Sequence, residues 1–156
     1  MTDIIIKQAS LADEEKIIAF QLAMADETEG LKLNPVILKT GINAVLTDVT
    51  KGIYYVAEIN NNIAGSMLVT YEWSDWRNGL VLWFQSVYVI PEYRGKGIFK
   101  KMYNFLKEKV LTDDKLKGLR LYVDKRNINA QKVYTSLGMS YEHYTMFEWM
   151  KEEPCI

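Results

Sequence analysis

One stretch of the sequence decides the fold, Ser86-Val87-Tyr88-Val89-Ile90-Pro91-Glu92-Tyr93-Arg94-Gly95-Lys96-Gly97-Ile98-Phe99-Lys100-Lys101-Met102. Residues 87–90 are β-branched or aromatic and precede Pro91, a pattern typical of a strand that ends at the proline. Apolar residues recur at helical spacing from Ile98 onward, which predicts a helix that starts near Gly97. The stretch therefore predicts a strand, a tight turn and a helix, in that order.

The turn between this strand and this helix has the chemistry of a phosphate site. Gly95 and Gly97 let the backbone turn sharply and approach a ligand without an intervening side chain. The first amides of a helix have no intrahelical acceptor and carry partial positive charge. Arg94 and Lys96 add to that field, so a phosphate group fits here. A bare pair of glycines, taken without further context, favours a plain tight turn.

Two widespread phosphate loops are absent from this stretch. A P-loop needs Ser or Thr after Lys96-Gly97, where Ile98 stands. The dinucleotide fingerprint needs a third glycine at the position of Lys100.

The stretch instead resembles the coenzyme A motif R/Q-x-x-G-x-G/A of the GNAT superfamily of N-acetyltransferases. Arg94, Gly97 and Phe99 stand at its three defined positions. Phe99 departs from the pattern, because a small residue is usual there. Its ring would either crowd the pyrophosphate or turn into the core while the backbone amide still donates, and we favour the second. The resemblance implies that acetyl-coenzyme A binds along Arg94, Gly95, Lys96, Gly97, Ile98 and Phe99.

A second segment resembles the same superfamily's pattern N-x-x-A-x-x-x-Y-x-x-x-G-F. Asn127, Ala130, Tyr134 and Gly138 match it, and Met139 replaces the aromatic residue. The resemblance implies that Tyr134 protonates the departing thiolate, although its helical spacing also suits a core residue. Asn127 either caps a helix or orients the pantetheine arm.

The resemblance also implies an oxyanion site on the strand. The donors would be backbone amides of Val87, Tyr88 and Val89, where this strand parts from the next one. Buried valines of an ordinary strand would give the same sequence, and the two interpretations are compatible.

The sequence offers several candidate residues for binding and deprotonating the acceptor. Glu72 leads as general base, acting directly or through a water that Gln85 holds, while Glu27 and Glu29 are further acidic candidates. Trp76 and Arg77 belong to a polar, aromatic loop over residues 72–79, where Arg77 would bind a substrate carboxylate or pair with an acid of the chain. Solvated helix ends and loops explain the same acids.

The rest of the chain completes one α/β unit over residues 1–156. We expect strands at 3–7, 53–59, 63–71, 80–90 and 119–123, helices over 11–29, 35–47 and 129–137 besides the one from Gly97, and a final hairpin of 139–142 with 145–150. A GNAT-like, mixed and mostly antiparallel sheet flanked by helices is the predicted fold class, α/β (α+β), in a single domain.

The composition of the chain argues against several classes of function and site. A formal net charge of −1, from 19 basic and 20 acidic residues, argues against a protein built to bind long nucleic acids. A lone cysteine, Cys155, excludes an internal disulfide, and a lone histidine, His143, makes a zinc site improbable. Without a signal-like or membrane-spanning apolar run, we expect a cytoplasmic protein.

These observations together predict a cytoplasmic N-acetyltransferase that carries acetyl from acetyl-coenzyme A to a primary amine of a small molecule or peptide, without a metal. A non-catalytic coenzyme A sensor or interaction module on the same fold is the alternative. Trp73 and Trp76 of the 72–79 loop would shape an apolar wall of the site or form a homodimer contact.

Overall fold

The computed structural model describes residues 3–151, so Cys155 lies outside the described residues. One five-stranded sheet runs through the molecule in the order β1-β2-β3-β4-β5. The strands are β1 (Ile4–Gln8), β2 (Ile53–Ile59), β3 (Asn62–Ser74), β4 (Gly79–Val89) and β5 (Leu116–Arg120). The helices are α1 (Glu14–Glu29), α2 (Pro35–Thr47), α3 (Ile98–Thr112) and α4 (Ile128–Ser136), with single 3-10 turns at Leu11–Asp13 and Pro91–Tyr93.

The first four strands are antiparallel to their neighbours, and β5 runs parallel to β4. A parallel neighbour needs a crossover connection, which α3 supplies. The expected mixed, mostly antiparallel α/β sheet is therefore confirmed.

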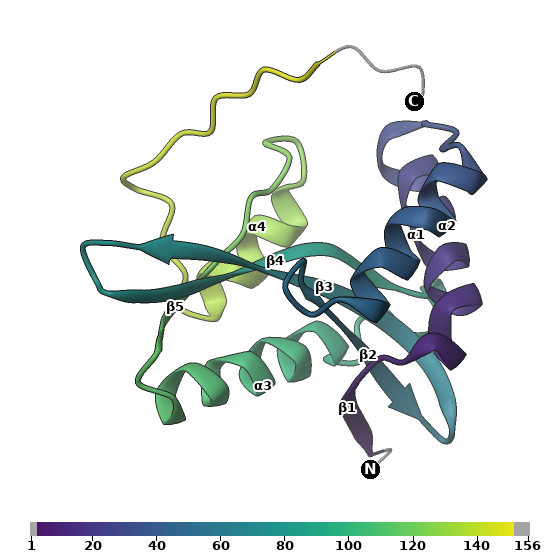
Figure 1. Cartoon of the computed structure of the whole chain (residues 1–156), viewed down its shortest axis with the longest axis horizontal. Coiled ribbons are helices and arrows are strands. Elements are labelled where there is room, and N and C mark those ends of the chain that lie inside the picture. The colour runs from purple at the N-terminus through teal and green to yellow at the C-terminus, as the bar shows by residue number, and fades with distance from the viewer. Residues whose placement is uncertain (1–2, 152–156) are drawn as a thin grey trace.

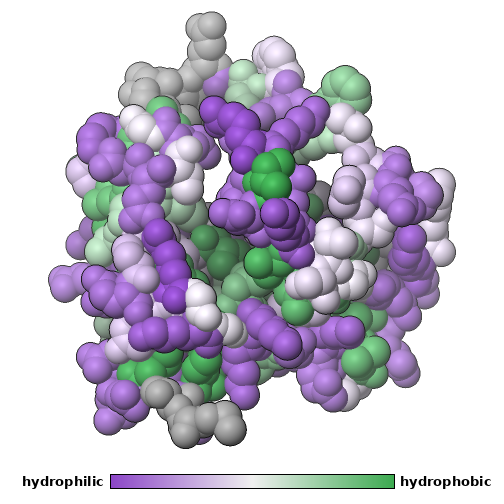
Figure 2. Space-filling view, turned by 180° about the vertical axis from the view of Figure 1, so that it is seen from behind, coloured by the Kyte–Doolittle hydropathy of each residue, from purple (hydrophilic) through white to green (hydrophobic). Residues whose placement is uncertain are grey.

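The helices cover both faces of the sheet (Figure 1). Tyr54 and Val56 of β2 pack with residues of α1 and α2, whereas Tyr55 and Ala57 pack with α3. Successive strand residues point to opposite faces, so α1 and α2 cover one face and α3 the other. The molecule is hollowed near the middle of the side turned away in Figure 1, with apolar atoms on the floor of the hollow and hydrophilic ones on its rim (Figure 2).

The β4–β5 pairing is short. Its last pair is Trp83 with Arg120, and β4 continues to Val89 without β5 alongside. The predicted strand 119–123 is therefore wrong at both ends. Pairing with the start of β4 moves β5 back to Leu116, and the divergence of the two strands ends it at Arg120. This end of β4, unpaired with β5, leads through the 3-10 turn Pro91–Tyr93 to the glycine turn.

Residues 72–74 belong to β3, not to the predicted loop. They pair with residues 79–81 of β4, so the connection shortens to the four residues 75–78. Asn78, at φ +47°, supplies the left-handed position that such a tight hairpin requires.

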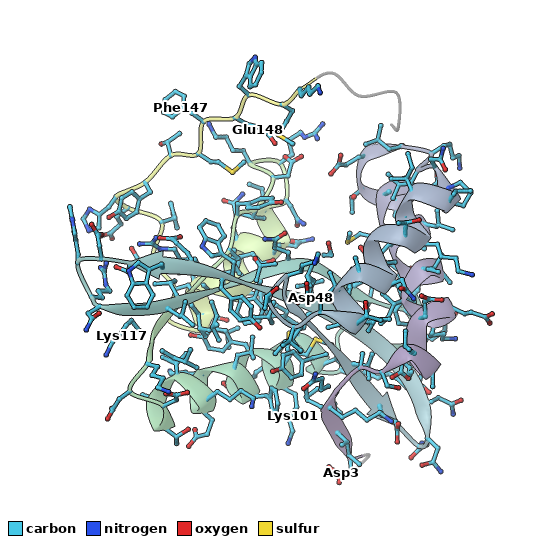
Figure 3. All side chains as sticks on the ribbon, viewed as in Figure 1. Asp3, Asp48, Lys101, Lys117, Phe147 and Glu148 are labelled. Atoms are coloured by element: carbon cyan, nitrogen blue, oxygen red, sulfur yellow. The ribbon has the colours of Figure 1, made fainter. Side chains whose placement is uncertain are left out.

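The predicted final hairpin, residues 139–142 with 145–150, is wrong. The chain from 140 to 151 contains no strand and arches away from the sheet, as the labelled Phe147 and Glu148 show (Figure 3). Alternating apolar residues favour a strand but supply no partner, and an isolated two-stranded hairpin has little stability of its own. The last residue of this segment that packs on the core is Met139.

Candidate functional site

The turn before α3 has the backbone that its glycines predict. Gly95 and Gly97 both adopt left-handed conformations, at φ +74° and +80°. A Cβ atom built at either position meets nothing within 4 Å, so the chain leaves the space beside the turn open. The first helical hydrogen bond runs from the amide of Lys101 to the carbonyl of Gly97. The amides of Ile98, Phe99 and Lys100 therefore lack intrahelical acceptors.

Arg94 is held by the protein itself. Its Nε donates to the carbonyl of Val89 at 2.8 Å, and its Nη2 donates to Glu27 at 2.6 Å. Tyr88 donates its hydroxyl to the other oxygen of Glu27 at 2.8 Å. The hydrogen bonds from Arg94 and Tyr88 lower the pKa of Glu27 below its ordinary value. Glu27 therefore holds the Arg94 guanidinium in place, and the guanidinium fixes the turn to β4 and α1.

A bulge interrupts β4 before the predicted oxyanion donors. Ser86 has φ +48°, and the β3–β4 register shifts between Ser66 and Leu68. Gln21 of α1, 4% exposed, donates to the carbonyl of Ser86 at 3.4 Å. Sequence reasoning missed both residues. The available signal was a glutamine, Gln21, on the apolar face of the first helix, because a buried amide needs a partner.

The bulge sets the orientation of the residues that follow it. Val87 and Val89 pack with the core on the α3 side, and Tyr88 contacts Phe20 of α1 on the other. The side chains thus fill both faces of the sheet, and the β4 edge beyond Trp83 faces the gap left by β5.

Phe99 turns into the core, as expected. Its ring lies 5.9 Å from that of Phe84 and 5.3 Å from that of Tyr134, centroid to centroid. The Tyr134 ring packs on that of Phe99. Its hydroxyl has no hydrogen-bond partner among residues 3–151, and burial raises its pKa. A protonated phenol that the protein leaves unpaired is available to donate to a ligand.

Asn127 caps α4, as one of its two expected roles requires. Its side-chain oxygen accepts from the amide of Ala130 at 3.0 Å. The structure accounts for this residue without a ligand.

Polar side chains gather on the face of β3, β4 and β5 that is turned away from α3. Trp83 donates its indole N–H to one oxygen of Glu72 at 2.6 Å, and Arg120 donates to the other. The hydrogen bond from Trp83 is the larger cause, and that from Arg120 the smaller, of a pKa of Glu72 below its ordinary value. Gln85 donates to Thr70 at 2.5 Å on the same face. Glu72 and Gln85 therefore share a surface without touching each other.

Among the remaining acceptor candidates, Arg77 lies near enough to Glu72 for its charge to help lower the pKa of that carboxyl. Glu29 is exposed at the end of α1. Trp76 is 88% exposed at the tip of the β3–β4 hairpin, and Arg77 donates weakly to Ser74 at 3.4 Å in that hairpin. The structure does not bring these three residues together.

Comparison with protein families matches residues 18–139 to the acetyltransferase (GNAT) family. The chain belongs to the GNAT family. The match covers the glycine turn, Tyr134 and Arg120, and it ends at Met139, where packing against the core also ends. A search of curated protein sequences finds no match.

Solved structures share this GNAT fold. A possible acetyltransferase from Clostridium difficile 630 is 43% identical over 96% of this chain and 99% of its own, with a TM-score of 0.89. A predicted acetyltransferase from Clostridium acetobutylicum, solved with acetyl-coenzyme A, is 18% identical over 94% and 96%, with a TM-score of 0.72. A ribosomal-protein-alanine N-acetyltransferase from Brucella melitensis is 15% identical over 96% and 100%, with a TM-score of 0.77.

None of the helices within residues 3–151 is long and apolar enough to cross a membrane.

Proposed function

We propose that this GNAT protein transfers acetyl from acetyl-coenzyme A to a primary amine of a small molecule or peptide. The observation that carries the proposal is the glycine turn at the start of α3. Three amides lack helical acceptors there, and a Cβ at Gly95 or Gly97 would enter open space. The turn thus fits a diphosphate, whose oxygens accept hydrogen bonds from such amides.

The acetyl thioester supplies the acyl group, and the protein's residues act on its two ends. Amides on the β4 edge past the bulge donate to the thioester carbonyl as negative charge develops on its oxygen. Val87 and Val89 are the proposed donors, because β4 has no β5 partner along these residues. The amide of Tyr88, the third expected donor, alternates toward β3, as the amide of Ile90 does where it donates to the carbonyl of Ala64. Gln21 and Ser86 keep the bulge in place, so these donors are oriented before the substrate arrives.

Tyr134 is the proposed acid. The raised pKa keeps its hydroxyl protonated at neutral pH, and the hydroxyl has no competing acceptor among the described residues. It donates its proton as the thiolate leaves. Phe99 holds the phenol ring in place by packing against it.

A base must accept the proton that the attacking amine loses. Glu72 keeps its place as the first candidate by position on the acceptor face, yet its lowered pKa makes it a poor proton acceptor. Water that reaches this partly exposed surface is the competing acceptor for the amine's proton. Glu72→Gln distinguishes Glu72 from water as the acceptor, because the variant would lose most of the enzyme's kcat if Glu72 were the direct base.

Thiol release from acetyl-coenzyme A in the presence of a panel of amines tests the proposal. We expect amine-dependent release, with the acetylated amine identified by mass. Binding of acetyl-coenzyme A without release to any amine would instead favour the non-catalytic sensor.

A further inference from the structure

Arg120 stands where the sheet opens. It is the last β5 residue paired with β4, opposite Trp83, and the two strands diverge beyond it. Leu119 and Leu121 pack with the α3-side core, so Arg120 points to the other face, which α1 and α2 cover further along. Arg120 therefore lies at the end of the gap, on the face away from α3.

The Arg120 guanidinium is held in place through only some of its N–H donors. Nη1 donates to Glu72, and the other N–H groups of Arg120 have no hydrogen-bond partner among residues 3–151. Both oxygens of Glu72 are taken, one by Arg120 and one by Trp83. Glu72 thus orients the guanidinium, and the remaining donors stay available for a second planar anion.

One aromatic ring lies against this cation. The Tyr144 ring lies 5.6 Å from the Arg120 guanidinium, and the neighbouring Trp83 ring lies 6.3 Å from that of Tyr122. The Tyr144 ring displaces water from part of the guanidinium surface and strengthens its hydrogen bonds to an anion. Arg77 adds a further positive charge near Glu72. The surface therefore repels a purely cationic acceptor and attracts a carboxylate.

We propose that Arg120 binds the carboxylate of the acceptor, and that the acceptor is an amino acid whose reacting amine lies several bonds from that carboxylate. This inference rests on the proposed acetyl transfer. Val87 lies four residues beyond Trp83 on β4, which is about 13 Å of strand. A long flexible acceptor spans much of this separation, whereas an α-amino acid, with both groups on one carbon, does not.

Acceptors matched in length and different in charge test the proposal. The panel is ω-aminohexanoate, its amide, hexylamine and alanine, each assayed by thiol release. We expect kcat/KM for ω-aminohexanoate to exceed that for its amide and for hexylamine by about ten-fold or more, because a charge-assisted bidentate contact is lost. Alanine is expected to be the poorest acceptor.

Variants assign the preference to Arg120. Arg120→Gln should bring the carboxylate and amide within about two-fold of each other, and Arg120→Lys should keep part of the preference. Lys109→Gln removes the same unit of charge from the far end of α3 and should change nothing. An unchanged preference in Arg120→Gln, or equal use of ω-aminohexanoate and hexylamine by the unaltered protein, would overturn the proposal.

A binding measurement separates this inference from the proposed function. Hexanoate titrated into the protein with coenzyme A present requires no turnover, and its binding should depend on Arg120. If hexanoate fails to bind while amines are still acetylated, the proposed role of Arg120 is refuted and the proposed acetyl transfer still stands. Arg120-dependent binding of hexanoate without acetyl transfer to any amine refutes the proposed function and leaves a carboxylate site.

Discussion

Replacing Gly97 with valine tests whether the turn before α3 is a ligand site or only a turn. The residue sits at φ +80°, where a side chain costs about 1–3 kcal/mol. The added atoms meet nothing within 4 Å of the Cβ position, so no steric cost within the protein adds to this. At about 2–4 °C per kcal/mol, Tm should fall by roughly 2–12 °C, and the protein should still fold.

The effect on coenzyme A binding should be much larger than this loss of stability implies. The side chain would stand in the space from which a diphosphate reaches the first amides of α3. Loss of one charge-assisted hydrogen bond costs about 1.5–3 kcal/mol, which corresponds to roughly a ten- to hundred-fold weaker Kd. Isothermal titration calorimetry of wild type and Gly97→Val with acetyl-coenzyme A measures this change.

Gly30→Val is the matched control. Gly30 also has a left-handed backbone, φ +65°, and its Cβ position is also empty within 4 Å, but it ends α1. It should lose a similar amount of stability and keep its affinity for acetyl-coenzyme A. If Gly97→Val bound as tightly as wild type, or if both variants weakened binding equally, the reasoning about the diphosphate would fail.

Three further outcomes are expected. Tyr134→Phe should lower kcat by ten-fold or more while the Kd of acetyl-coenzyme A stays within about two-fold; equal rates would remove Tyr134 from the mechanism. Glu27→Gln should weaken acetyl-coenzyme A binding several-fold by releasing Arg94, with a stability loss below about 1 kcal/mol because the pair is exposed. The pKa of Glu27 is lowered from 4.5, so its pair with Arg94 stabilises the fold above pH 4.5 and stops doing so as the pH falls through the lowered value. Urea unfolding at several pH values should show this loss of stability in the wild type, and Glu27→Gln should remove this part of the pH dependence. Met102→Ala, at a fully buried position of α3, should cost about 2–5 kcal/mol in urea unfolding, and a loss under 1 kcal/mol would contradict its place in the core.

Local signals predicted most of the fold. Asn34-Pro35 marks the start of α2, and the Asn34 side chain does cap it. The three asparagines 60–62 mark the β2–β3 turn, where two of them have positive φ. Such signals are contained in a few adjacent residues, so sequence alone reveals them.

Pairing between distant residues set what the sequence did not predict. The end of β5 depends on where β4 diverges from it, and β3 extends to Ser74 because β4 lies beside it. Neither partner is visible from the strand's own residues. Residues 140–151 show the converse, since their alternating pattern predicts strands for which the structure offers no partner.

In the candidate site too, local features were predictable from the sequence and contacts between distant residues were not. The glycine turn and the inward position of Phe99 followed from motif positions. The partners of Arg94 and Glu72 did not, because Glu27 and Arg120 lie 67 and 48 residues away in the sequence. The resulting pKa shifts are properties of these contacts, and they change the expected roles of both residues.

We propose above that main-chain donors at the start of α3 bind the diphosphate of coenzyme A. Calorimetry that compares acetyl-coenzyme A with acetyl-pantetheine, which lacks the diphosphate, measures this contact. Acetyl-pantetheine should bind at least about a hundred-fold more weakly, since several charge-assisted hydrogen bonds are lost. Equal affinities, or no uptake of acetyl-coenzyme A at millimolar concentration by folded protein, would contradict it.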